Sequence, residues 1–406
     1  MSLKSDYFLP LPPHMKYYII AGEVSGDIHS SNLIKAIRLQ DKNAVFRFWG
    51  GDQMELATKK KAVKHISELA FMGFVEVLGN LRAILNNISF CKRDILDFKP
   101  DALILVDYPG FNLRIAKFAH LQAIKVFYYI SPQIWAWKEK RIKIIQKYVD
   151  KMLVILPFEK AFYQKHNVDV HFVGHPLLDH IQNTKNSSSS IIIKGIEEIK
   201  KNNTKIIALL PGSRSQEVKR MLPNMVAIAK DNSFKDYHFV ICGLNNFSLD
   251  FYLDIFDPHL NKKEINPEHG VYKVGSNISL AFDQTHIILQ NAFAAVVTSG
   301  TATLETALFR VPEVVCYSAN GISYEIAKRL IKLSYISLVN LIMEREVVKE
   351  IIQDEYNISN LTLEVKKLLN IEVRERILKD YDDLHSKLGG EGASQKAANI
   401  IVDEIS

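Results

Sequence analysis

The alternation of short apolar runs with helical stretches restricts the fold of this chain more than any other feature. Runs such as "YYIIAGE" (17–23), "ALILVDY" (102–108) and "VHFVGHP" (170–176) have the length and the β-branched and aromatic content of buried strands. Helical patterns such as "NLRIAKFAHL" (112–121) lie between them. Strands and helices that alternate in this way predict a parallel, doubly wound α/β sheet.

The alternation stops once and then starts again. The segment "NTKNSSSSIIIKGIEEIKKNNTK" (183–205) is rich in Asn, Ser and Lys, as interdomain linkers are, and new strand patterns follow from "KIIALLPGSR" (205–214) onward. A chain of 406 residues also exceeds what one hydrophobic core usually serves. We therefore expect two Rossmann-like domains that face a cleft, followed by C-terminal helices that pack back toward an N-terminal domain. The expected divisions are 15–182, the linker 183–204, 205–344 and the helical segment 345–406.

Charge and cysteine usage exclude several classes of protein. The chain has 51 Lys and Arg against 45 Asp and Glu, a net charge of +6 that suits anionic substrates or lipid surfaces. It has no long basic run with interleaved aromatic residues, so nucleic acid is not indicated. Cys91, Cys242 and Cys316 are widely spaced, which fits a reducing compartment and neither a disulfide framework nor a zinc site. Since no apolar run approaches the ~20 residues that span a bilayer, we expect a cytoplasmic protein.

The first strand leads into "AGEVSGD" (21–27), where a dinucleotide-binding fold would carry a glycine fingerprint. This loop holds Glu23 and Asp27 instead. Carboxylates repel phosphate, so the loop suits substrate hydroxyl groups better and argues against a dinucleotide-dependent oxidoreductase. Alternatively, the two carboxylates cap the helix that follows.

Two loops of the second half have the character of anion-binding sites. "PGSR" (211–214) and "TSGTAT" (298–303) each follow a strand and open a helix with small, hydroxylated or cationic residues. A glutamate one turn into the second helix is placed to accept hydrogen bonds from ribose hydroxyls. Together they predict a nucleotide-diphosphate site made of Gly212, Ser213, Arg214, Ser299, Gly300, Thr301, Ala302, Thr303 and Glu305.

Blocks along nearly the whole chain, from about Lys16 onward, resemble the lipid-A-disaccharide synthase family. They include "VDYPGFN" (106–112), "SPQIWAWK" (131–138), "VGHPLLD" (173–179) and "LLPGSRSQEV" (209–218). The resemblance implies an inverting glycosyltransferase of the GT-B fold. Such an enzyme transfers 2,3-diacylglucosamine from its UDP donor to 2,3-diacylglucosamine 1-phosphate, which gives a β-1,6 disaccharide and UDP. It assigns the acceptor to the first domain, the UDP-sugar to the second, and Asn340 to the donor site.

Inverting transfer needs a general base near the acceptor 6-hydroxyl. Asp107 ends a strand and precedes Tyr108 and Pro109, so it is the first candidate, with Glu23 and Asp27 as alternatives. A purely structural role, in which Asp107 binds loop N–H groups, remains open. The second acidic residue that the family has in this loop is Gly110 here, which puts a mechanism with two carboxylates in this loop in doubt.

The sequence indicates no metal and no cofactor, because it has no Asp-x-Asp at a strand end and no cluster of His and Cys residues. His175 is a lone histidine after a strand and is interpreted as structural.

A UDP-sugar epimerase or another GT-B UDP-sugar transferase is the alternative function. A non-catalytic membrane-associated binding protein would leave the two anion loops unexplained. The glycine-rich "GGEG" (389–392) permits the C-terminal helices either to fold back on their own first domain or to be exchanged with a partner chain in a homodimer.

The stretch "ELAFMGFVEVLGNLRAIL" (68–85) carries more apolar surface than one helix face needs. Both implied substrates are acylated, so we expect this stretch to meet acyl chains or the inner leaflet of the inner membrane as a peripheral contact. A helix buried between sheets would show the same pattern. The residues concerned are Phe71, Met72, Phe74, Val75, Leu78 and Leu81.

Trp135 and Trp137 stand beside Lys138, Lys140, Arg141 and Lys143. An aromatic pair next to a basic helix suits an interface that meets phosphate or lipid headgroups. The alternative is two core tryptophans beside a solvated helix face.

Overall fold

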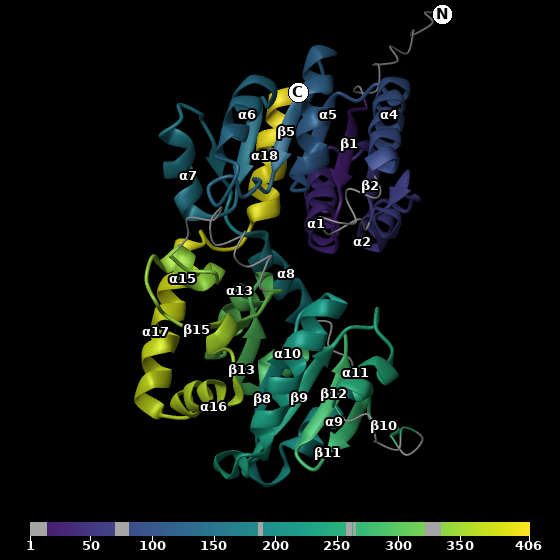
Figure 1. Cartoon of the computed structure of the whole chain (residues 1–406). Coiled ribbons are helices and arrows are strands. Elements are labelled where there is room, and N and C mark those ends of the chain that lie inside the picture. The colour runs from purple at the N-terminus through teal and green to yellow at the C-terminus, as the bar shows by residue number, and fades with distance from the viewer. Residues whose placement is uncertain (1–13, 70–80, 186–189, 257–261, 263–264, 321–333) are drawn as a thin grey trace, which may run out of the picture. The chain divides into compact units, whose positions relative to one another are not determined.

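The structure is a computed structural model that describes residues 14–69, 81–185, 190–256, 262, 265–320 and 334–406. The chain forms two compact units (Figure 1). Unit 1 comprises Met1–Pro176 together with Glu391–Ser406, and unit 2 comprises Leu177–Gly390. The segment expected to be a linker contains a helix, α9 (Ser190–Ile199).

Unit 1 is built on a parallel sheet in the order β3-β2-β1-β4-β5-β6-β7, as far as the described residues show. The inner strand β1 has Tyr17 to Ala21 completely buried, which explains the uninterrupted apolar run in the sequence. The strands are β1 (Lys16–Ala21), β2 (Val45–Gly50), β3 (Lys64–His65), β4 (Ala102–Val106), β5 (Lys125–Tyr129), β6 (Lys151–Val154) and β7 (His171–Phe172).

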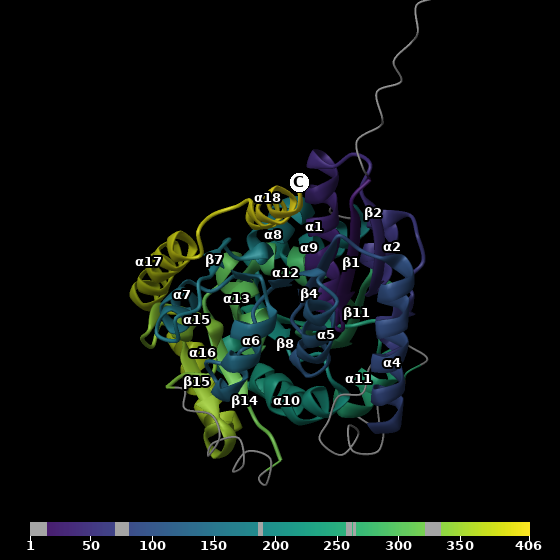
Figure 2. The ribbon, with the colours of Figure 1, turned by 90° about the horizontal axis from the view of Figure 1, so that it is seen from above.

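Helices cover the sheet of unit 1 in two groups. The helix α5 contacts α4 and α6, whereas α1 contacts α2 and the C-terminal helix α18. Figure 2 shows α18 beside α1, although the two helices come from opposite ends of the chain. The helices are α1 (Val24–Gln40), α2 (Asp52–Thr58), α4 (Leu81–Phe98), α5 (Pro109–Leu121), α6 (Ile142–Tyr148), α7 (Pro157–Gln164) and α18 (Ala393–Ile405).

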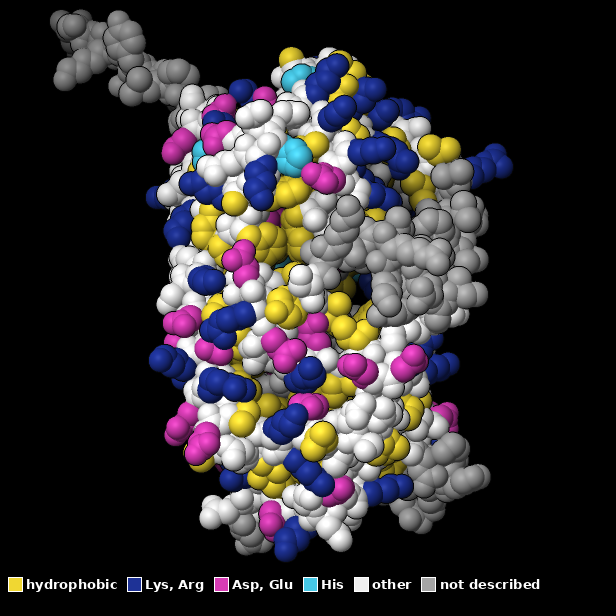
Figure 3. All heavy atoms as spheres, turned by 60° about the vertical axis from the view of Figure 1, so that its left-hand side comes forward, with side chains coloured by type: hydrophobic (Ala, Val, Ile, Leu, Met, Phe, Trp, Pro, Cys, Tyr) yellow, Lys and Arg dark blue, Asp and Glu magenta, His cyan; other side chains and the backbone are white. Residues whose placement is uncertain are grey.

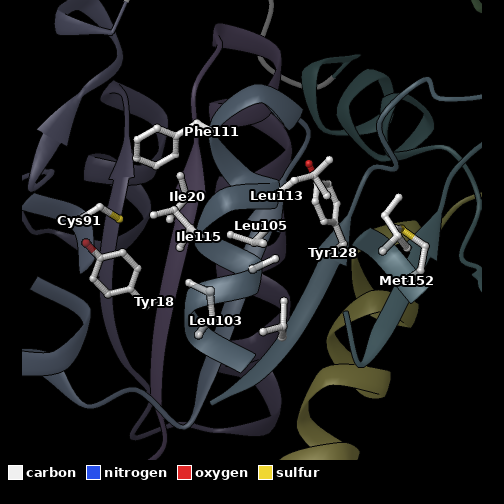
Figure 4. Packing of buried hydrophobic residues seen from close by; sticks show 14 of the residues in the cluster. Tyr18, Ile20, Cys91, Leu103, Leu105, Phe111, Leu113, Ile115, Tyr128 and Met152 are labelled. Atoms are coloured by element: carbon white, nitrogen blue, oxygen red, sulfur yellow. The ribbon is translucent and has the colours of Figure 1, made fainter. Parts of the chain in front are cut away.

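The core of unit 1 packs α4 and α5 against the central strands (Figure 4). Tyr18 is fully buried there, and its hydroxyl donates to Asp94 Oδ2 at 2.6 Å and accepts from Trp49 Nε1 at 2.9 Å. Asp94 also pairs with Arg47. The buried polar groups therefore satisfy one another, which allows aromatic side chains with polar ends in the core.

Unit 2 has a sheet in the order β10-β11-β12-β9-β8-β13-β14-β15 among its described residues. The edge strands β10, β11 and β12 pair antiparallel, and the other pairs are parallel. The strands are β8 (Lys205–Leu210), β9 (Tyr237–Gly243), β10 (Pro267–Glu268), β11 (Val271–Gly275), β12 (Ile278–Phe282), β13 (Ala292–Thr298), β14 (Glu313–Tyr317) and β15 (Lys349–Ile352).

The helices of unit 2 include part of the C-terminal segment. The guanidinium of Arg345 donates two hydrogen bonds to the carboxylate of Asp380, each 2.9 Å long, and these bonds hold α17 to the rest of unit 2. The helices are α8 (Pro176–Lys185), α9, α10 (Ser215–Ala227), α11 (Leu249–Phe256), α12 (Thr285–Asn291), α13 (Thr301–Leu308), α15 (Leu338–Met343), α16 (Ile358–Lys367) and α17 (Ile371–Lys387). The prediction of two Rossmann-like α/β units with a helical C-terminal segment is confirmed.

Each sheet has one point where the strand order reverses. In unit 1 the chain moves from β1 outward to β3, and then returns to place β4 on the other side of β1. In unit 2 the corresponding neighbours are β8 and β13. Ligands of open α/β sheets bind beyond the carboxyl ends of the strands at such points. Among the helices described here, none combines the length and the apolar character needed to cross a membrane.

Candidate active site

The reversal point of unit 1 brings two predicted carboxylates together. Ala21 at the end of β1 pairs with Val106 at the end of β4, so Glu23 and Asp107 follow adjacent strand ends. Glu23 occupies the position before α1, and Asp107 lies just before α5. The charge of Glu23 acts on Asp107. These two predicted residues therefore share one site.

The backbone at Asp107 adopts an unusual conformation. Asp107 and Tyr108 both have left-handed φ angles, 44° and 46°. Non-glycine residues adopt this region at an energetic cost, and surrounding contacts have to hold them there. The hydroxyl of Tyr128 donates to the carbonyl oxygen of Asp107 at 2.6 Å, and Asn112 Nδ2 donates to the same oxygen at 2.8 Å.

Asn112 is completely buried and ties the ends of both strands to the loop. Besides Asp107, its Nδ2 donates to the carbonyl oxygens of Val106 at 3.2 Å and Ile20 at 3.4 Å. Sequence reasoning missed both Asn112 and Tyr128. An asparagine in the first turn of a helix that follows a functional strand end is the signal that points to such a role.

The pKa of the Asp107 carboxyl is raised from 3.8 to about 7. Burial is the largest cause, and the negative charge of Glu23 adds to it, whereas the N–H of Tyr108 partly offsets both by donating to the carboxylate. A carboxylate with a pKa near neutral can take a proton and later release it at physiological pH. This environment gives Asp107 the properties of a general base.

The ring of Tyr108 lies over Gly22. A Cβ atom at position 22 would stand 2.5 Å from Cγ of Tyr108, so only glycine allows this approach. The same ring stacks on Phe111 at 5.5 Å between centroids. Gly22 and Phe111 thus fix an aromatic ring next to Asp107.

Asp27, the third predicted carboxylate, has another task. Its carboxylate accepts hydrogen bonds from the N–H groups of Gly51 at 2.7 Å, Gln53 at 3.0 Å and Met54 at 3.1 Å. These groups form the amino end of α2, so Asp27 caps that helix and not its own. We therefore do not include Asp27 among the candidates for the general base.

The reversal point of unit 2 brings together the two predicted anion loops. Leu210 at the end of β8 pairs with Val297 of β13, so 211–214 and 298–303 follow neighbouring strands. In the first loop Gly212 has a φ of 112°, which favours glycine. A Cβ atom there would also lie 2.8 Å from Oε2 of Glu217.

Glu217 organises this first loop and was missed from the sequence. Its Oε2 accepts from the N–H groups of Ser213 at 3.2 Å and Arg214 at 3.3 Å, and its Oε1 lies 3.3 Å from the guanidinium of Arg214. The side chains of Ser213 and Arg214 are exposed. Glu217 thus fixes the loop, and Arg214 presents its guanidinium at the strand end.

The second loop has both exposed and internally bonded members. Gly300 and Thr301 are exposed and Ala302 is half-buried. Ser299 Oγ donates to the carbonyl oxygen of Ile336 at 3.1 Å, and Thr303 Oγ1 donates to that of Gly300 at 2.9 Å. Gly300 and Thr301 therefore offer the open approach to the amino end of α13.

Glu305 lies one turn into α13 and is paired with His286 of α12. Both side chains are partly exposed, 19% and 20%. The His286 ring also stacks edge-on against His180, with 5.2 Å between centroids. Sequence reasoning did not identify His286, because nothing in its own segment marks it as a neighbour of Glu305.

Asn340, assigned by resemblance to the donor site, is completely buried. Its Nδ2 donates to Val348 O at 2.8 Å and to Glu350 Oε1 at 2.9 Å, and its Oδ1 accepts from the N–H groups of Val347 at 2.8 Å and Val348 at 3.0 Å. The carboxamide is fully occupied by these groups. We therefore leave Asn340 out of the proposed donor contacts.

The predicted membrane or acyl-chain residues Phe71, Met72, Phe74, Val75 and Leu78 lie outside the described residues. Leu81 is the first residue of α4, and the structure describes its backbone but not its side chain.

The two tryptophans differ from each other. Trp135 is half-buried and packs edge-on against Phe158, with 4.8 Å between the ring centroids, whereas Trp137 is 40% exposed.

His175 is buried, and burial, followed by the charge of His29, lowers its pKa to about 3. A neutral, buried His175 agrees with the structural role predicted for it. No cluster of three or more His, Cys, Asp or Glu side chains suited to a metal occurs in the described part of the chain.

Two Rossmann-like units, each with a candidate site at its reversal point, define a GT-B protein. Solved structures with this fold include the UDP-GlcNAc 2-epimerase from Neisseria meningitidis bound to UDP-GlcNAc (TM-score 0.63, 15% identity, 96% of this chain and 99% of that chain). Another is the S. aureus MnaA–UDP co-structure (TM-score 0.65, 14% identity, 96% of each chain). At these identities the likeness shows the fold alone.

The sequence comparisons are more specific. The family model for lipid-A-disaccharide synthetase matches residues 17–404. The lipid-A-disaccharide synthase of Geobacter metallireducens is 35% identical over 97% of this chain and 98% of its own. That of Syntrophus aciditrophicus is 37% identical over 94% and 95%. The chain belongs to the lipid-A-disaccharide synthase family and is a glycosyltransferase.

Proposed function

We propose that the chain transfers 2,3-diacylglucosamine from its UDP donor to the 6-hydroxyl of 2,3-diacylglucosamine 1-phosphate. The products are the β-1,6 lipid A disaccharide 1-phosphate and UDP. The observation that carries this proposal is the family match over residues 17–404. The raised pKa of Asp107 at a reversal point supports it, because the reaction needs a base there.

In the proposed mechanism Asp107 removes the proton of the acceptor 6-hydroxyl. The resulting oxygen nucleophile attacks the anomeric carbon of the donor from the face opposite UDP, so the configuration inverts and the bond to the diphosphate breaks. Glu23 raises the basicity of Asp107 and can also bind an acceptor hydroxyl. Unit 1 is thus the acceptor-binding half in this proposal, and it contains most of the predicted acceptor domain, residues 15–182.

Unit 2 holds the donor in this proposal. Arg214 and Ser213 bind the diphosphate together with Gly212 and the loop Ser299, Gly300, Thr301, Ala302 and Thr303. The positive charge of Arg214 stabilises the UDP that leaves. Glu305 accepts hydrogen bonds from the ribose hydroxyls, and His286 orients its carboxylate. The proposed mechanism uses no metal and no cofactor.

We further propose that the enzyme works peripherally at the inner leaflet of the cytoplasmic membrane, where its acylated substrates lie. The helix α4 supports this, because its exposed side includes Leu85 at 53% and Leu96 at 44% beside exposed Arg82 and Arg93. An apolar and basic helix face suits an anionic bilayer surface.

We also propose that the chain forms a homodimer in which the two subunits exchange their helices α18. It packs on α1 and follows Gly389, Gly390 and Gly392, which have left-handed φ angles. Light scattering of the purified chain tests the oligomeric state.

The function is tested by mass spectrometry of the products formed in detergent from both diacylated substrates. Wild type is compared with D107N and R214A, and with the exposed-site controls D169N and R376A. We expect disaccharide from wild type and from both controls, and about a 100-fold or larger loss in D107N. Epimerisation of UDP-GlcNAc without disaccharide formation would contradict the proposal and favour an epimerase.

A further inference from the structure

Two cationic side chains of unit 1 lie against an exposed tryptophan, and a third is close enough to act on one of them. Lys138 Nζ lies 4.0 Å from the centroid of the Trp137 ring, and Arg141 Cζ lies 5.8 Å from it. Trp137 is 40% exposed, so the group is open to solvent. On the face shown in Figure 3, Lys and Arg side chains gather over the upper body, which is unit 1. The sequence pattern of tryptophans beside a basic segment therefore forms a real cluster.

The third cation connects this cluster to the loop of the candidate base. Arg114 donates from its guanidinium to the carbonyl oxygen of Gly110 at 2.9 Å, three residues after Asp107. Arg141 lies close enough to Tyr128 for the two to interact, and Tyr128 donates to Asp107 O at 2.6 Å. The cations therefore border the loop that presents Asp107.

No carboxylate among the described residues pairs with Arg114, Lys138 or Arg141 within ion-pair distance. The neighbouring Glu139 instead pairs with His166 at 3.0 Å. Burial, followed by the positive charge of Arg141, lowers the pKa of Lys138. Burial also lowers the pKa of Arg141, and the positive charge of Arg114 lowers it further. Neighbouring cations that repel one another without a counter-ion form a site that an anion would stabilise.

We propose that Arg114, Lys138 and Arg141 bind a phosphomonoester, and that this group is the 1-phosphate of the acceptor sugar. Guanidinium groups suit phosphate because they donate two parallel hydrogen bonds, and Lys138 adds a compact charge. The 1-phosphate is carried by C1 and the 6-hydroxyl by C6, which is attached to C5, so the two groups lie on either side of the ring oxygen of one sugar. Cations beside the 107–110 loop can thus hold the phosphate and direct the hydroxyl toward Asp107. The inference rests on the proposed function, whose acceptor carries this phosphate.

The kinetic test compares two acceptors in neutral detergent: 2,3-diacylglucosamine 1-phosphate and the same sugar without phosphate. The variants are R141Q and K138Q, with K143Q as control. Lys143 is exposed in α6, which begins directly after Arg141, and the cations found over the Trp137 ring among the described residues are Lys138 and Arg141. We expect the KM for the phosphorylated acceptor to rise about ten-fold or more in R141Q and K138Q. The KM for the unphosphorylated acceptor should stay unchanged, as should both values in K143Q. Equal changes for the two acceptors, or none, would overturn the proposal.

A lipid headgroup phosphate is the other source of the same chemistry. Sedimentation with vesicles of phosphatidylglycerol and of phosphatidylcholine separates the two. The proposal predicts that R141Q and K138Q bind both kinds of vesicle as wild type does. If the variants lose binding to phosphatidylglycerol vesicles while the two KM values keep their ratio, the cluster binds headgroups and the proposal is overturned.

A direct binding measurement separates this inference from the proposed function. Glucosamine 1-phosphate is titrated while tryptophan fluorescence is followed, with glucosamine as the uncharged comparison. We expect a saturable change with the phosphate in wild type and K143Q and its loss in R141Q and K138Q. If wild type makes no disaccharide yet gives this change, the proposed function fails and the phosphate site stands. Disaccharide formation without any fluorescence change overturns the phosphate site alone.

Discussion

Replacing Asp107 by asparagine should remove the catalytic base and stabilise the folded protein at the same time. The substitution keeps the shape of the side chain, and the new carboxamide oxygen can still accept the N–H of Tyr108. What disappears is a negative charge that is partly buried and lies near Glu23. The site therefore holds Asp107 in a state that favours catalysis over stability.

The size of the effect follows from the pKa, which rises from 3.8 to about 7 on folding. A raised pKa in an acid means that the folded state disfavours the ionised form. The penalty is absent below the ordinary pKa, grows as the pH rises from about 4 to about 7, and is constant above. At 1.36 kcal/mol for each tenfold change in proton affinity, its upper limit is about 4 kcal/mol, and relaxation of the site should reduce it to about 2 kcal/mol.

The assay is urea unfolding of wild type, D107N and the control D169N at pH 8 and at pH 4. We expect D107N to gain about 2 kcal/mol in its free energy of unfolding at pH 8 and under about 0.5 kcal/mol at pH 4. D169N should match wild type at both values, because Asp169 is exposed. A D107N variant that is less stable than wild type at pH 8 would contradict this expectation, since it would mean that the loop depends on the ionised carboxylate.

Other substitutions test the remaining contacts. E23Q should move the lower limb of the pH–rate profile toward lower pH by about one unit, because Asp107 then lacks the neighbouring negative charge; a profile that does not move contradicts this coupling. N112A should lower kcat about ten-fold or more with little effect on the donor KM, since Asp107 O loses one of its donors; an equal change in both constants would point to general misfolding. E305Q should raise the donor KM about ten-fold and leave the acceptor KM unchanged, which steady-state kinetics with each substrate varied will show. G212A should raise the donor KM as well, because its Cβ atom would meet Glu217; wild-type kinetics in G212A would show that this loop tolerates the change.

Part of this site can be predicted from the sequence because of a property of parallel sheets. Their strands all end at the same edge, so the residues after two buried runs fall close together. This is why the sequence alone points to Glu23 and Asp107, and likewise to the 211–214 and 298–303 loops. The same periodic apolar runs predict the two sheets themselves.

Other parts depend on packing that the local sequence does not record. Asp27 caps α2, a helix more than twenty positions away, and not the helix on which it lies. His286 acts on Glu305, nineteen positions away, and Asn112 reaches Ile20 on another strand, partners that only the folded backbone brings within reach. Asn340 reads as a loop residue, yet the structure buries it completely among backbone groups. Polar residues of this kind can serve either a ligand or the chain itself, and only their contacts distinguish the two.

The pH dependence of disaccharide formation by the wild-type enzyme shows whether Asp107 is the general base of the reaction. kcat/KM for the acceptor is measured between pH 5 and pH 9 at saturating UDP-diacylglucosamine. With Asp107 as the base, we expect disaccharide to form and kcat/KM to rise ten-fold per pH unit up to about pH 7, where Asp107 becomes ionised, and to be level above. A rate that does not change between pH 5 and pH 7, or the absence of disaccharide at every pH, would contradict it.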